Sequence, residues 1–125
     1  MANASVSFVN LTPHAIVIRL VDGTDLTIAP SGKVARVDEA PNSVVDEIGG
    51  VPVLAKSVFT EVIDLPKPVE GTAFIVSGLV AGAVSRADVF SPATGPKDDA
   101  IRNEKGHIVA VKSLKATLSY GVVIS

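Results

Sequence analysis

Short runs of β-branched and aliphatic residues, repeatedly interrupted by glycine and proline, constrain the fold of this chain most strongly. The clearest case is residues 14–21 (HAIVIRLV), which are followed by Asp22-Gly23 and a second run at 25–29 (DLTIA). An Asp-Gly pair between two such runs predicts a β-hairpin, because both residues tolerate the positive φ of a tight turn. The sequence therefore predicts a chain built from short strands.

The composition supports one β-rich domain. The chain has 125 residues, 47% of them hydrophobic but only 4% aromatic, so its core must consist mainly of Val, Ile, Leu and Ala. Residues branched at Cβ suit a pleated, half-buried surface. We expect a single mainly β (β-rich α+β) domain over residues 1–125, arranged as an antiparallel sheet or sandwich or a partly open barrel.

The pattern along the chain places the individual elements. Four early runs predict an N-terminal antiparallel meander of three or four strands, at residues 5–11, 14–21, 25–29 and 33–37. Residues 43–48 fit either a strand or one helical turn before Gly49-Gly50. One short helix is expected at 77–85, capped by Ser77. Further strands are expected at 51–54, 56–63, 72–76 (buried), 86–90, 107–114 and 117–124.

Charge and residue usage disfavour several functional classes. The net charge is −2 and the 11 basic residues are scattered, whereas nucleic-acid binding usually shows clustered Lys and Arg. The absence of cysteine removes disulfides and thiolate chemistry. No apolar run approaches the roughly 20 residues of a membrane-spanning helix, and the first residues do not resemble a signal peptide. We expect no nucleic-acid partner, no membrane association, no cofactor and a cytoplasmic location.

The irregular segment 91–106 is the first candidate for a site, because loops on a rigid scaffold often carry function. It contains Thr94, Lys97 and Asp98, and Arg86 and Arg102 are predicted to lie in reach. Such groups can hold a phosphate or a carboxylate. The alternative is an ordinary solvated loop. The adjacent pair Asp98-Asp99 forms a poor metal cage, because neighbouring side chains on an extended chain point to opposite sides.

The two histidines occupy the starts of predicted strands. His14 follows Thr12-Pro13, and His107 follows Gly106. No nucleophile elbow or other local triad signature accompanies either residue. Each is interpreted as a structural histidine, with His14 also a candidate base for a small hydrolase or isomerase.

Several stretches together resemble a set of small proteins encoded by bacteriophages and prophages, for which no function is assigned. The resemblance rests on VNLTPHAI at 9–16, PSG and ARV at 30–37, FIVS at 74–77, RADV at 86–89, TGPKD at 94–98 and IVAV at 108–111. It implies a viral accessory protein acting inside a bacterial cell. It implies no chemistry, and no catalytic residue follows from it.

The leading functional hypothesis is a non-enzymatic protein that sequesters a small anionic, nucleotide-like ligand, such as an immune signalling nucleotide of the bacterial host. Its ligand groups would be Arg86, Lys97 and Arg102 for phosphates, Asp88 and Asp98 for ribose hydroxyls or base edges, and Thr12, His14 and Thr94 as neutral donors. The alternative is a protein–protein interaction module, either an inhibitor of a host protein or a minor virion component. The high aliphatic content also predicts a homo-oligomer. An exposed Val/Ile face would favour the interaction module.

Overall fold

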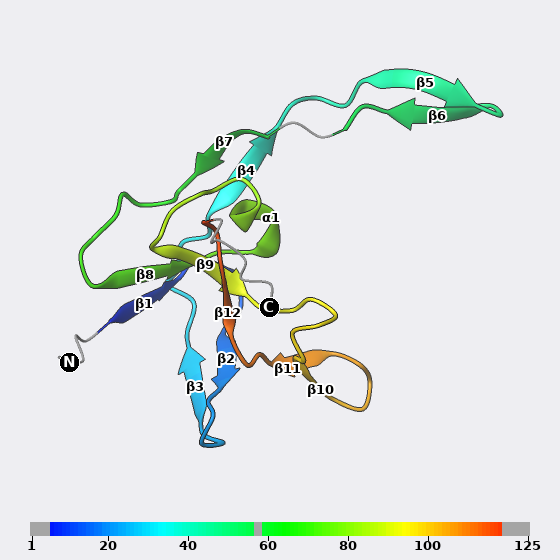
Figure 1. Cartoon of the computed structure of the whole chain (residues 1–125). Helices are drawn as coiled ribbons and strands as arrows, with labels where there is room; N and C mark the ends of the chain where they lie inside the picture. Colours follow the sequence, from blue (N-terminus) through cyan, green and yellow to red (C-terminus); the bar gives the residue numbers. More distant parts are fainter. Residues whose placement is uncertain (1–5, 57–58, 119–125) are drawn as a thin grey trace, which may run out of the picture.

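A computed structural model describes residues 6–56 and 59–118, and of Phe59 and Thr60 it describes only the main chain. It confirms a β-rich chain with one short helix (Figure 1). The central sheet has four strands in the order β1-β8-β9-β12, namely β1 (Ser7–Asn10), β8 (Thr72–Ile75), β9 (Val89–Pro92) and β12 (Leu114–Ala116). The β1–β8 and β8–β9 pairs are parallel and the β9–β12 pair is antiparallel, so this sheet is mixed.

Four antiparallel strand pairs extend from this sheet. They are β2 (Ile16–Arg19) with β3 (Asp25–Ile28), β4 (Arg36–Glu39) with β7 (Phe59–Ile63), β5 (Val44–Ile48) with β6 (Val51–Leu54), and β10 (Ile101–Arg102) with β11 (Ile108–Ala110). Over the described residues, none of these sheets closes into a barrel. The β5–β6 hairpin projects away from the body beyond the β4–β7 pair (Figure 1).

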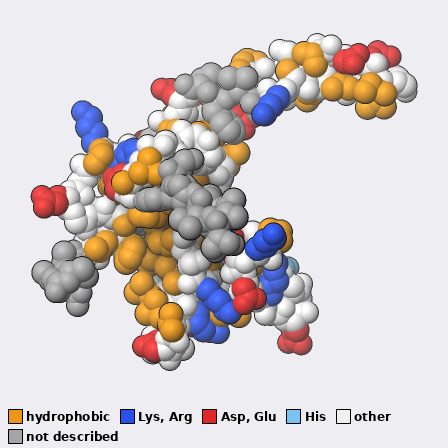
Figure 2. All heavy atoms as spheres, in the orientation of Figure 1, with side chains coloured by type: hydrophobic (Ala, Val, Ile, Leu, Met, Phe, Trp, Pro, Cys, Tyr) orange, Lys and Arg blue, Asp and Glu red, His pale blue; other side chains and the backbone are white. Residues whose placement is uncertain are grey.

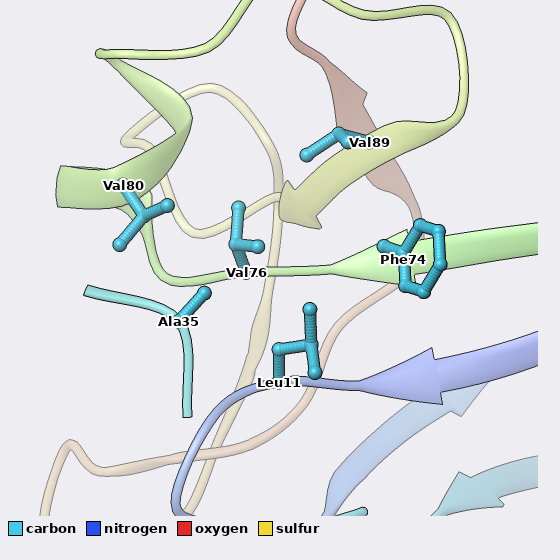
Figure 3. Packing of buried hydrophobic residues seen from close by; sticks show 6 residues of the cluster. All are labelled: Leu11, Ala35, Phe74, Val76, Val80 and Val89. Carbon is cyan, nitrogen blue, oxygen red and sulfur yellow. The ribbon is translucent and has the colours of Figure 1, made fainter. Parts of the chain in front are cut away.

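The core consists of two hydrophobic clusters on opposite faces of β8. One contains Leu11, Ala35, Phe74, Val76, Val80 and Val89 (Figure 3). The other contains Ile16, Ile18, Ile28, Ile75 and Val111. Successive side chains of a strand point to opposite faces, so Phe74 and Ile75 enter different clusters. The uninterrupted apolar run at 72–76 therefore reflects a strand that is buried on both faces.

The predicted hairpin at Asp22-Gly23 is confirmed. β2 and β3 pair from Ile16 opposite Ile28 to Arg19 opposite Asp25. Gly23 has a φ of 89°, and its N–H donates to the Leu20 carbonyl across 2.9 Å. A side chain at this φ would strain the turn.

The predicted N-terminal meander is wrong beyond that hairpin. β1 pairs with β8 and not with β2, and β4 pairs with β7 from later in the chain. Between β1 and β2 the chain turns a corner at Thr12 and Pro13 instead of forming a hairpin. Long-range pairing of this kind depends on burial partners that no local pattern reveals.

The helix lies where predicted but is shorter. α1 covers Gly78–Ala81, and the Ser77 hydroxyl accepts a hydrogen bond from the Val80 N–H at 3.4 Å, as expected of a helix cap. Gly78 and Gly82 lower the helical propensity, which explains why the helix ends before residue 85. No helix among the described residues is long and apolar enough to cross a membrane.

Two strand boundaries also differ from prediction. The run at 86–90 enters the sheet only from Val89, and the run at 107–114 divides into β11 and β12. Of the two alternatives left open for residues 43–48, the structure shows the strand, at Val44–Ile48. The strand predicted at 117–124 lies largely outside the described residues.

Candidate functional site

The corner between β1 and β2 uses Asn10 and Thr12 as structural residues. Asn10 is 1% exposed, and its side-chain amide donates to the carbonyls of His14 at 2.8 Å and Ile28 at 3.0 Å. Its Oδ1 accepts the Thr12 N–H at 2.9 Å and the Thr12 hydroxyl at 2.7 Å. This network satisfies the polar groups of a buried amide. Thr12 therefore stabilises the corner through both its N–H and its hydroxyl.

Arg86 and Asp88 form an ion pair near the start of β9. Arg86 Nη2 lies 2.7 Å from Asp88 Oδ2, and Arg86 Nε lies 3.0 Å from Asp88 Oδ1. A third guanidinium donor reaches the Pro66 carbonyl at 2.9 Å, and the guanidinium carbon lies 5.9 Å from the centre of the Phe74 ring. The Arg86 hydrogen bonds hold the pKa of Asp88 below its ordinary value. The two side chains are only 24% and 20% exposed. Through Arg86 the pair links the 66–68 connector to the sheet.

Asp98 anchors the TGPKD turn. Its Oδ2 accepts the Gly95 N–H at 2.7 Å and lies 2.7 Å from Lys115 Nζ on β12. The hydrogen bond from Lys115 and that from Gly95 lower the pKa of Asp98. Lys97, in the same turn, is exposed and forms no hydrogen bond or ion pair with any described residue.

Arg102 stabilises the β10–β11 hairpin. Its Nη1 donates to the Gly106 carbonyl at 2.7 Å, at the turn that begins with Asn103. The neighbouring ion pair joins Lys112 Nζ to Asp99 Oδ2 at 2.8 Å, and both side chains are largely exposed. That contact holds the pKa of Asp99 below its usual range. An exposed pair of this kind contributes little to stability.

An open groove of about 340 Å³ lies on the body, and two of the eight predicted site residues line it. They are His14 and Thr94. The remaining lining is apolar and comes from Ala15, Ile16, Val17, Pro92, Ile108, Val109, Ala110 and Val111. None of the three predicted phosphate-binding cations lines it. The structure thus brings His14 and Thr94 together and places Arg86, Lys97 and Arg102 elsewhere.

Main-chain hydrogen bonds fix the shape of the groove. Arg19 N–H donates to the Val111 carbonyl and Val111 N–H donates to the Val17 carbonyl, each at 2.8 Å. These two bonds tie the chain after β11 to the side of β2. The imidazole of His14 is exposed at this groove and forms no hydrogen bond or ion pair within the described part of the chain.

A second candidate surface is the β5–β6 hairpin, Val44–Leu54, which we call the arm. Five of its apolar side chains are exposed: Val44 (66%), Val45 (63%), Ile48 (66%), Val51 (62%) and Leu54 (51%). Figure 2 shows hydrophobic side chains along the arm and acidic side chains toward its far end. Exposed apolar side chains gathered on one element mark an interaction surface.

The arm carries apolar side chains on both faces. Residues directly opposite each other in an antiparallel pair share a face. Ile48 is opposite Val51, and Val44 is opposite Leu54, with Glu47 opposite Pro52 between them. Val51 and Leu54 are three positions apart on β6, so the two apolar pairs occupy different faces.

Sequence reasoning missed the arm as a candidate binding element, although a signal was present. The segment VVDEIGGVPVL lacks the clean apolar–polar alternation of a strand that covers a core with one face. A hairpin that has apolar residues on both faces and belongs to neither core cluster of the described residues is typical of an element that is buried by another molecule.

Comparison with known proteins identifies no relative for this chain. No protein-family model, no curated protein and no solved structure matches it. Within residues 6–56 and 59–118, no group of three or more His, Asp or Glu side chains is placed to hold a metal ion.

Proposed function

We propose that this chain is a protein-binding protein whose binding element is the arm. The observation that carries the proposal is the exposure of Val44, Val45, Ile48, Val51 and Leu54 on a hairpin that projects from the body. Among the hypotheses from the sequence, this favours the interaction module. In the context that the sequence resemblance implies, the partner would be met inside a bacterial cell.

Energetics support a bound state for the arm. An isolated two-stranded hairpin is only marginally stable in water. Full burial of a Val, Ile or Leu side chain contributes about 1.5–3 kcal/mol, so covering five half-exposed ones contributes roughly 5 kcal/mol. Association costs about 4–15 kcal/mol in lost translational and rotational freedom. One arm alone roughly offsets the lower end of that cost, so the complex needs a second contact of similar size.

A photoreactive side chain tests this function directly. Benzoylphenylalanine placed at Val51 on the arm should form a covalent adduct with a protein after irradiation of bacterial cells that express the full chain. The matched control is the same group at Val69, which is similarly exposed (55%) but lies in the connector before β8. Equal adduct yields from the two positions would remove the arm from consideration.

A small anionic ligand is the second candidate function. His14 and Thr94 both line the groove, and Lys97 lies three residues beyond Thr94 with an ammonium that forms no hydrogen bond or ion pair with the described residues. Calorimetry with cyclic nucleotides and ADP-ribose derivatives tests this proposal. A ligand bound there should lose affinity in His14→Ala, and an absence of heat with every compound counts against it.

A further inference from the structure

We infer that the arm of one copy docks in the groove of a second copy. This inference rests on the proposed function and adds the identity of the partner and its receiving surface. The arm leaves the body beyond β4 and β7, whereas the groove is built by β2, β11 and the end of β9 at the opposite side of the molecule (Figure 1). The two surfaces therefore cannot meet within one chain.

The chemistry of the two surfaces matches. The arm presents Ile48 and Val51 together beside the Gly49-Gly50 turn, with exposed fractions of 66% and 62%. The groove is lined mainly by aliphatic side chains, and Ile108 and Val109 on its wall are themselves 37% and 47% exposed. Contact between them removes apolar surface from water on both sides.

The edges of the arm favour docking through side chains over addition of a strand. Pro52 in β6 has no N–H and so cannot donate a hydrogen bond to an added strand; edge strands often contain proline for this reason. In β5 the Glu47 N–H is occupied by the Asp46 carboxylate at 2.7 Å. Both strands thus lack a donor that an incoming strand would use.

Charge complementarity identifies a second copy as the occupant. Residues 37–55, which contain the arm, include four acidic residues and no basic one. Residues 97–115, which contain one wall of the groove, include five basic residues and three acidic ones. Figure 2 shows Lys and Arg side chains on the lower part of the body, where β10 and β11 lie in Figure 1. An acidic, apolar arm and an apolar groove beside basic residues attract each other.

Specific cations stand next to the groove. Arg102 is opposite Ile108 in the β10–β11 pair, and Lys112 follows Val111. In the docked state, Asp46 and Glu47 would face these cations while Ile48 and Val51 occupy the apolar lining. Reciprocal docking about a two-fold axis covers both arms and doubles the buried surface, which supplies the second contact that a single arm lacks.

Mixed single-cysteine variants test this arrangement, because the native chain has no cysteine to interfere. Ile48→Cys on the arm is mixed with Ile108→Cys at the groove, and a short bis-maleimide is added. The control mixture replaces Ile48→Cys by Val69→Cys. The expected result is a mixed dimer between the first two variants, in a yield at least about tenfold above the control, the ratio that about 1.4 kcal/mol of specific contact produces.

Each other outcome overturns the inference. Products that join Ile48→Cys only to itself would show arms meeting arms, which leaves the arm as a protein-binding element but removes the groove. A monomer by sedimentation, with no product above the control, would exclude the second copy. In that case an adduct between the Val51 photoprobe and a different protein would still support the proposed protein-binding function. The lack of any adduct would contradict both that function and the docking of a second copy.

Charge reversal provides an independent readout. Asp46→Lys with Glu47→Lys should raise the dissociation constant of the dimer by about tenfold or more, as for like charges brought together at an interface. Mixing this variant with Lys112→Glu should recover more of the affinity than mixing it with Lys67→Glu, altered in the connector, because in the second mixture only one of the two docked arms meets a groove of opposite charge. Equal recovery from both mixtures would contradict docking beside Lys112.

Discussion

The side-chain amide of Asn10 donates to the main-chain carbonyl of Ile28 across 3.0 Å and so joins the end of β1 to the end of β3. The same amide reaches the carbonyl of His14 at 2.8 Å. Asn10 is thus the centre of the NLTPH corner, and that segment, prominent in the sequence, holds two strand pairs together. The corner also positions His14 at the groove.

Asn10→Asp is expected to destabilise the fold. The substitution replaces the side-chain NH2 group, which donates to two carbonyls, by a carboxylate oxygen that faces the same carbonyls in a site that is 1% exposed. Buried unsatisfied and repelling groups of this kind cost about 3 kcal/mol in free energy of unfolding. Urea unfolding followed by circular dichroism measures the loss. Thr12→Val, which keeps the amide, should cost only about 1 kcal/mol; an Asn10→Asp midpoint equal to that of the native chain would refute this role.

Arg86→Ala should lower the free energy of unfolding by about 2 kcal/mol, because it removes a partly buried ion pair, a hydrogen bond to the Pro66 carbonyl and the contact with the Phe74 ring. Lys97→Ala is the matched control and should change stability by less than about 0.5 kcal/mol, as for an exposed side chain. Thermal unfolding of both variants distinguishes a structural Arg86 from a ligand-binding one. Equal melting temperatures would contradict the structural role.

The free energy of unfolding should fall in acid because Asp88 becomes protonated and loses its ion pair with Arg86. Asp88 has an ordinary pKa of 3.8 and a lower pKa in the folded chain. Its stabilising contribution is therefore complete above pH 3.8 and is lost as the pH falls through the folded pKa. In Asp88→Asn the dependence on pH should be shallower, and its deficit relative to the native chain should be largest at neutral pH. A deficit that is constant from neutral pH into acid would contradict this linkage.

The arm should contribute little to the stability of the body. Ile48→Asp with Val51→Asp alters only exposed positions, so in dilute solution the free energy of unfolding should change by less than about 0.5 kcal/mol. Val89→Ala, at a position that is 0% exposed, should cost about 2 kcal/mol. A large loss from the arm variant would show that the arm packs on its own body.

Local features of the fold were predictable from the sequence, and its long-range pairing was not. Asp22-Gly23 determines its hairpin because the turn itself requires positive φ. Ser77 predicts the helix start because its hydroxyl caps a free N–H. By contrast, the pairing of β1 with β8 joins segments more than sixty residues apart, and nothing within either segment specifies the other.

The candidate site shows the same division. Thr94 and His14 were predicted from their chemistry, and the fold brings them to one groove. Arg86 carries the same charge as Lys97, but the sequence does not reveal that Asp88, two residues later, turns back to pair with it. The arm was overlooked because an apolar run is read as core until the structure shows that no core lies beside it.

Chemical labelling of the arm inside cells tests the central claim most directly. Val51→Cys on the arm and Val69→Cys on the connector place single thiols at positions with exposed fractions of 62% and 55%. In dilute purified protein, a membrane-permeant maleimide should label both at similar rates. In intact bacterial cells, an arm covered by a partner predicts labelling of Val51→Cys at least about tenfold slower than that of Val69→Cys, the ratio expected for about 1.4 kcal/mol of protection. Equal labelling rates in the cell would contradict the account.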